Sequence, residues 1–196
     1  MTICLLASGA GAQDSHPARF DRPVGPEGPD ERLFQEAVLF YVNVERRRAG
    51  QRSLANDAKL ARVAAGHAAN MAAHRLMSHR LAVPKGGKLV ERLQGNGVPY
   101  RRAGENIAMD KAFRLVGRPI STRAVGCAFT YADTGEPVPR HTHASLATAA
   151  VTRWMNSKGH RDNILDPNFR RMGAGAAIDP GGPACGDVYL AQNFTG

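Results

Sequence analysis

The residue types that could do chemistry in this chain lie in three stretches, and the most distinctive stretch surrounds His160. An apolar run from Leu146 to Met155 has helical spacing, and Gly159 and His160 follow it closely. Helices often end at a glycine, and an imidazole just beyond such an end lies on a rigid rim, where it can bind a metal ion or move a proton. The spacing therefore predicts that the helix breaks at Gly159 and presents His160.

Ser157 is a second residue of interest in the same stretch, three positions before His160. It could act as a nucleophile that the histidine activates, but no acid that would orient the histidine is evident in the sequence. Capping or hydrogen bonding at the helix end is a simpler role for this hydroxyl.

Glu105 and His79 are the other candidates. A strand is expected over Ala103–Met109, with Glu105 and Ile107 on one face. A carboxylate that faces an apolar core needs a cation or hydrogen-bond donors, although the pattern fits a solvent-facing Glu105 equally well. His79 follows a helical stretch, and a lone histidine in such a place is usually structural or exposed.

Two early helices precede these candidates. Asp30 can cap the first, and the second starts at Asn56 or Asp57. His67 and His74 lie on the second helix about 10 Å apart along its axis, too far to share one metal ion. We therefore interpret His67 as a core histidine.

The remaining elements are short. We expect a helix over Lys85–Gln94, a strand over Ala128–Tyr131, and a C-terminal hairpin of strands Phe169–Ile178 and Asp187–Phe194. His141 and His143 could pair on a metal ion, but alternating histidines in a polar loop are usually exposed, and we expect no site there.

Size and composition indicate one globular domain. The chain has 196 residues, of which 43% are hydrophobic and 22% charged, and its formal net charge is +9. A basic balance could favour nucleic acid, but aromatic residues are 6% and do not alternate with the arginines. We therefore expect a solvated basic surface, no nucleic-acid partner and a monomer.

The N-terminal segment suggests export. Residues 1–12 resemble the end of a signal peptide, with a short apolar run and the cleavage pattern Ala10-Gly11-Ala12, and proline-rich residues 13–29 are expected to form an extended leader outside the core. No later run is long enough for a transmembrane segment. Cys4 falls in the signal, which leaves Cys127 and Cys185 to form a disulfide in an oxidising compartment or to remain as buried thiols.

Three motifs, in order along the chain, resemble those of the bacterial branch of the CAP superfamily, also called SCP or PR-1-like. Trp154–Leu165 matches W-x-x-S-x-G-H-R-x-N-I-L at every fixed position, Gly104–Ile107 is the G-E-N-I motif, and Tyr189–Phe194 resembles the closing strand. The resemblance covers about residues 32–194. It implies an α+β fold, a three-layer α-β-α sandwich with a small antiparallel sheet, in a domain at 30–196 with an insertion at about 110–144.

The resemblance also implies a site. Family members place two histidines and one or two glutamates in a central cleft, here His79, His160 and Glu105, a reasonable donor set for Zn²⁺ or another divalent cation. Ser157 stands where the non-bacterial branch has a second glutamate, which puts strong metal binding in doubt. Cys127 is expected to join the insertion to the last strand through Cys185.

Two functions are consistent with these residues. The first, which we favour, is a secreted or periplasmic binding module whose cleft holds a metal ion, a lipid or an envelope polymer. The second is a metal-assisted hydrolase with Glu105 as ligand or general base.

Overall fold

Two aspartates begin the two long helices, as the sequence predicted. The structure, a computed structural model, describes residues 15–83, 86–121 and 127–196, so the predicted signal segment and Cys4 lie outside the described residues. The Asp30 carboxylate accepts a hydrogen bond from Leu33 N at the start of α1 (Glu31–Arg48). Asp57 does the same for Lys59 N and Leu60 N at the start of α2 (Ala58–His74). These carboxylates satisfy amide groups that a helix leaves unpaired at its N-terminus.

The main sheet has four strands in the order β1-β5-β6-β2. β2 (Ala103–Lys111) and β5 (Arg171–Asp179) run antiparallel to β6 (Asp187–Thr195) along their whole nine-residue lengths, while β1 (Ala55–Asn56) pairs in parallel with β5. The predicted hairpin and the strand that carries Glu105 are confirmed, with ends shifted by one or two residues.

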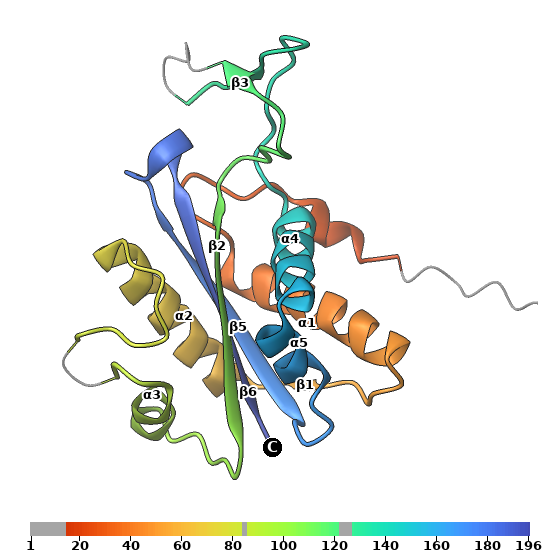
Figure 1. Ribbon diagram of the computed structural model, residues 1–196, viewed down its shortest axis with the longest axis vertical. Coiled ribbons are helices and arrows are strands. Elements are labelled where there is room, and N and C mark those ends of the chain that lie inside the picture. The colour runs from red at the N-terminus through yellow and green to blue at the C-terminus, as the bar shows by residue number, and fades with distance from the viewer. Residues whose placement is uncertain (1–14, 84–85, 122–126) are drawn as a thin grey trace, which may run out of the picture.

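Helices cover both faces of this sheet (Figure 1), which confirms the three-layer sandwich. α2 and α3 (Leu89–Gly95) lie on one side, and α1, α4 (His143–Asn156) and α5 (Lys158–Leu165) lie on the other. α2 can approach β5 closely because β5 has glycines at the contact. A Cβ at Gly173 would lie 2.0 Å from Ala61 N, and one at Gly175 would lie 2.3 Å from Ala65 N. These glycines therefore set how close α2 lies to the sheet, and with it the position of His67.

The segment before α1 contributes to the core, which corrects one expectation. Residues 15–29 include a short 3₁₀ helix, η1 (Ala18–Asp21), and Phe20 and Val24 are each 1% exposed within the main core cluster. The leader is therefore not outside the core. Beyond η1 the described residues 15–29 form no helix or longer strand, but Phe20 and Val24 still pack in the core with α1 and α4.

His141 and His143 are also buried, so the prediction that they are exposed was wrong. His143 is the first residue of α4, and its Nε2 accepts a hydrogen bond from Asp30 N at 2.9 Å. Its Nδ1 donates to Arg22 O at 2.7 Å. The histidine thus holds the leader against α4, a contact between distant parts of the chain that local polarity does not reveal.

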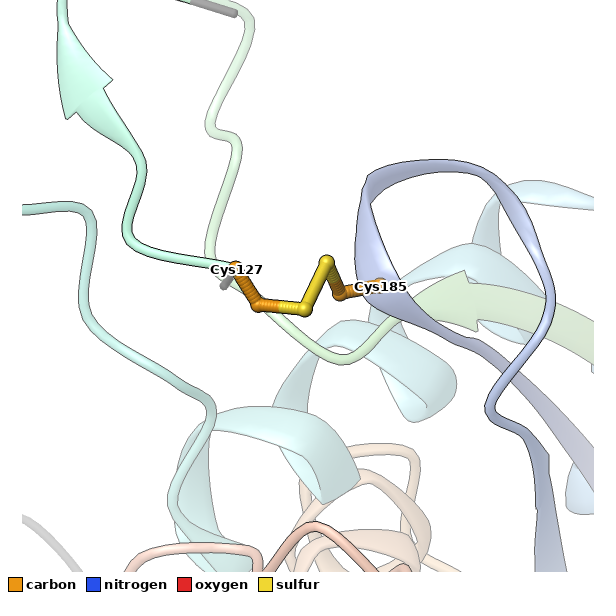
Figure 2. Close-up of a disulfide and its surroundings, with 2 residues drawn as sticks. All are labelled: Cys127 and Cys185. Carbon is orange, nitrogen blue, oxygen red and sulfur yellow. A yellow bond between two sulfur atoms is a disulfide. The ribbon is translucent and has the colours of Figure 1, made fainter. Parts of the chain in front are cut away.

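The segment between β2 and α4 projects from the body and carries a two-stranded sheet of β3 (Ile120–Ser121) and β4 (Thr130–Tyr131) (Figure 1). Figure 2 shows the disulfide bond between Cys127 and Cys185, which joins this segment to the short helix η2 (Pro183–Cys185) beside β6. The bond closes a sequence separation of 58 residues, which stabilises the fold by about 4 kcal/mol on the chain-entropy model. Among the described residues, no helix has the length and apolar character that a membrane crossing requires.

Candidate functional site

Glu105 on β2 is a buried carboxylate whose two oxygens are both occupied by hydrogen-bond donors. Its side chain is 4% exposed, and Oε1 accepts from His79 Nδ1 at 3.0 Å. Oε2 accepts from Arg92 Nη2 at 2.5 Å. With its amide oriented to satisfy both neighbours, Asn193 on β6 donates to the same oxygen at 3.1 Å. The sequence left the orientation of Glu105 open, and the structure places it inside.

Arg92 is the buried partner of Glu105 that the sequence interpretation missed. It lies on α3 with a side chain only 6% exposed, and its Nη1 also donates to the carbonyls of Gly86 and Gly87. Ion pairing with a buried carboxylate is the usual way to bury an arginine. The available signal was the need of Glu105 for a donor, but the sequence does not show which of the many arginines supplies it.

His79 and His160 come together beside Glu105. Their ring centroids are 6.3 Å apart, and the His79 side chain is 53% exposed. His160 lies in the first turn of α5 rather than beyond a helix end: α4 ends at Asn156, and Gly159 is inside α5, so the predicted break at Gly159 was wrong. The helix boundary was therefore misplaced by the sequence interpretation, while His160 does lie near His79.

Two asparagines fix α5 against β2. Asn106 Nδ2 donates to His160 O at 3.2 Å, and Asn163 Nδ2 donates to Asn106 Oδ1 at 2.9 Å and to Glu105 O at 3.2 Å. Glu105 and Asn106 belong to the G-E-N-I motif, and His160 and Asn163 belong to the Trp154–Leu165 motif. The motifs therefore include a buried amide network that positions His160 relative to Glu105.

His67 on α2 is fully buried, as the core interpretation predicted, and it also lies next to the carboxylate. Its Nε2 donates to Ser78 O at 3.0 Å and lies 3.8 Å from Glu105 Oε1. We name the set His67, His79, Arg92, Glu105 and His160 the Glu105 cluster.

Charge within the Glu105 cluster determines its protonation. Burial by itself raises the pKa of Glu105, but the hydrogen bond from His79 and the charge of Arg92 outweigh it, so the pKa lies below its usual value. Burial lowers the pKa of His67, against an opposing effect of the Glu105 charge. Burial and then the neighbouring His79 lower the pKa of His160. At neutral pH the cluster therefore holds an ionised glutamate and neutral His67 and His160.

Ser157 is the residue between α4 and α5, and its side chain caps neither helix. Its backbone oxygen accepts from Arg161 N at 2.8 Å. It lines a shallow surface hollow with Thr152, Arg153 and Asn156. Within the described part of the chain, the structure offers no contact with His160 that would activate Ser157 as a nucleophile.

The donor set does not fit a metal ion held jointly by His79, His160 and Glu105. Among the described residues, no group of three His, Cys, Asp or Glu side chains is arranged to hold one. The physical reason is Arg92, whose positive charge lies against the carboxylate where a cation would need to bind. The second carboxylate oxygen is used by His79.

The three-layer sandwich, with a glutamate on an edge strand and histidines from the α2–α3 connection and α5, defines the class of protein. The chain matches the model for the CAP (cysteine-rich secretory protein) family over residues 39–194, and it belongs to this family.

Two Bacillus subtilis (strain 168) proteins are similar to the chain. YkwD is 28% identical over 142 residues, and the membrane protein YlbC is 29% identical over 160 residues. These alignments take in 72% and 82% of this chain but 42% and 34% of the relatives. The chain thus spans well under half the length of either relative.

Solved structures show the same fold. An extracellular SCP-domain protein from Bacillus anthracis is 27% identical with a TM-score of 0.59, covering 85% of this chain and 41% of that one. An outer surface protein from Borrelia burgdorferi has a TM-score of 0.57 at 13% identity, covering 85% of this chain and 95% of that one. The latter likeness concerns the fold alone.

Proposed function

We propose that this chain is an extracytoplasmic, non-enzymatic binding module. It binds a polar group of a lipid or of a cell-envelope polymer beside His79 and His160. The solved relative described as extracellular supports this location. The disulfide supports it as well, since such bonds persist in oxidising compartments.

The observation that carries the proposal is the burial of Glu105, with a donor on each of its oxygens. A general base must be accessible to the group whose proton it removes, and its pKa must lie near the working pH. Glu105 accepts from His79, Arg92 and Asn193, and its pKa is below the usual value. It therefore fits a residue that positions His79 rather than a catalytic residue.

His79 is then the group that meets the ligand. An ionised carboxylate can only accept, so His79 Nδ1 carries the proton and Nε2 presents a lone pair from a half-exposed ring. With Glu105 and Arg92 neutralising each other, a cation gains little here. A hydroxyl or amide group, which can donate to this lone pair, is the better match.

The test is cosedimentation of the protein with purified peptidoglycan sacculi and with phosphatidylglycerol vesicles. We expect one of the two to retain the wild type, and His79→Ala and His160→Ala each to weaken retention about tenfold. Surface Arg153→Ala is the control that leaves it unchanged. Absence of retention by both materials, with folded protein, would contradict the proposal.

Zinc titration by calorimetry on the same variants tests whether His79 and His160 bind a metal ion instead. Weak or undetectable binding is expected, because Arg92 opposes a cation. Micromolar binding that both His79→Ala and His160→Ala abolish would instead establish a shared metal site and reopen the hydrolase alternative.

One observation favours hydrolysis as a second candidate. The Glu105–His79 pair has the arrangement of a carboxylate that orients a histidine base, with Nε2 directed away from the carboxylate. If His79 is such a base, the protein should hydrolyse at least one substrate in a set of esters and amides. His79→Ala should then abolish the activity and Glu105→Gln should reduce it, with folding intact in both variants.

A further inference from the structure

A hollow between α2 and α3 is separate from His79 and His160. Its volume is about 400 Å³, within the range of small-molecule sites. α2 supplies Arg62, Gly66 and Asn70 to its lining, and Asn96 follows α3. The buried side chains of His67 and Arg92 complete one wall.

Glycines keep this hollow open. A glycine inside a helix costs about 0.5–1 kcal/mol relative to alanine, and Gly66 lies in the middle of α2. Gly173 is needed because another element packs closely against it. No element packs against Gly66 in this way, since a Cβ at that position would meet nothing within 4 Å. Gly95 at the end of α3 is equally open, and neither glycine has a positive φ. Larger side chains at these two positions would therefore fill part of the hollow.

Two side chains that line this hollow, His67 and Arg92, each carry a buried polar atom with unused hydrogen-bonding capacity. Among the described residues, neither His67 Nδ1 nor Arg92 Nε has a hydrogen-bond partner. His67 donates through Nε2 to the Ser78 carbonyl, so Nδ1 carries a lone pair and acts as an acceptor, whereas Arg92 Nε–H is a donor. A hydroxyl group accepts from a donor and donates to an acceptor at once, so it matches both atoms.

The rim of the hollow points to a neutral ligand. Arg62 and Glu91 carry opposite charges, Asn70 and Asn96 carry amides, and the charge of Arg92 is balanced by Glu105. We propose that the hollow between α2 and α3 is a second binding site, and that it takes a neutral, hydroxyl-rich saccharide unit. This site goes beyond the proposed function of His79 and His160, since it uses a different surface.

The test is an NMR titration of the full chain with tri-N-acetylchitotriose, a neutral sugar trimer. We expect amide shifts to concentrate at Gly66, Asn70, Gly95 and Asn96. Gly66→Leu places a side chain in the hollow without touching the core, and it should weaken the affinity at least about tenfold. Ala69→Leu, an exposed position of the same helix outside the hollow, is the matched control and should leave the affinity unchanged.

His160→Ala distinguishes this site from the proposed function, because it should leave the trimer affinity unchanged while it weakens retention on sacculi or vesicles. Absence of shifts at millimolar trimer would overturn the inference, and so would equal affinity in Gly66→Leu and wild type. Binding of a sulfated sugar trimer in preference to the neutral one would also overturn it, since the rim would then select an anion.

Discussion

The indole N–H of Trp154 donates to the carbonyl of Ile107 at 3.0 Å, and both residues are buried. Ile107 lies on β2, an edge strand of the main sheet, so its carbonyl on the outer side has no neighbouring strand to pair with. Asn163 does the same for the carbonyl of Glu105. The tryptophan and asparagine of the C-terminal motif thus complete the hydrogen bonding of the strand that carries the glutamate.

Replacing Trp154 with phenylalanine should lower the free energy of unfolding by about 2–4 kcal/mol. The change leaves the buried Ile107 carbonyl without a donor and opens a small cavity. Denaturant titration measures the loss. The exposed neighbour Arg153→Ala should change stability by less than about 1 kcal/mol, and an equal loss in both variants would contradict the assignment.

Arg92→Met should lower the free energy of unfolding by about 3–5 kcal/mol, because it leaves a buried carboxylate without its counter-charge. Glu105→Gln should also destabilise, by stranding the guanidinium. The double variant should lose less than the sum of the two single losses, as a double-mutant cycle by denaturant titration would show. Strict additivity would mean that the ion pair contributes nothing.

Stability should fall as the pH drops below about 6.5, the ordinary pKa of histidine. Burial lowers the pKa of His67 in the folded state, so below pH 6.5 the unfolded chain binds a proton that the folded chain excludes. The free energy of unfolding then decreases with falling pH, by at most about 1.4 kcal/mol per pH unit for each such group. His67→Gln keeps a donor for Ser78 O and should flatten this slope between pH 6.5 and 5.

Glu105 adds a second, more acidic loss. Its pKa is lowered in the folded state, so its contribution is complete above the usual value of 4.5 and disappears as the pH falls through the folded pKa. Thermal melts from pH 8 to pH 3 would separate the two ranges. A wild type whose melting temperature stays constant from pH 7 to pH 5 would contradict the burial of a neutral His67.

Gly173→Ala should destabilise the fold by more than about 3 kcal/mol, because its Cβ would collide with the backbone of α2 rather than with a side chain that can move. Gly159→Ala in α5 is the matched control. Its Cβ meets nothing within 4 Å, and the gain in helix propensity should leave stability equal or higher by up to about 1 kcal/mol. Circular dichroism melts compare the two directly.

Local signals accounted for much of the fold. Asp30 and Asp57 were identifiable as caps because capping depends on residues within one turn. The hairpin was identifiable because its strands adjoin in sequence. The helix boundary near Gly159 was missed because the chain continues as helix through the glycine, so a local breaker was overridden by the packing of α5 on β2.

The candidate site was predictable only in part. Glu105 and His160 lie in motifs, His79 was inferred from the family resemblance, and the three do come together. Arg92 was not inferred, because its burial depends on a carboxylate thirteen residues away that faces it across the layer. His143 was misassigned for the same reason, since its partners, Arg22 in the leader and Asp30 at the start of α1, lie more than a hundred residues earlier.

The place of β6 in the sheet has a consequence for biosynthesis. This strand, residues 187–195, lies between β5 and β2, so β2 has no strand partner until β6 has emerged. A ribosome delivers Glu105 and the two helices of the early sequence long before that strand, and the nascent chain cannot assemble its sheet meanwhile. The sheet therefore closes after synthesis of this region rather than during it. Until then β2 lacks its partner strand, so this domain cannot complete its folding before its last strand has left the ribosome.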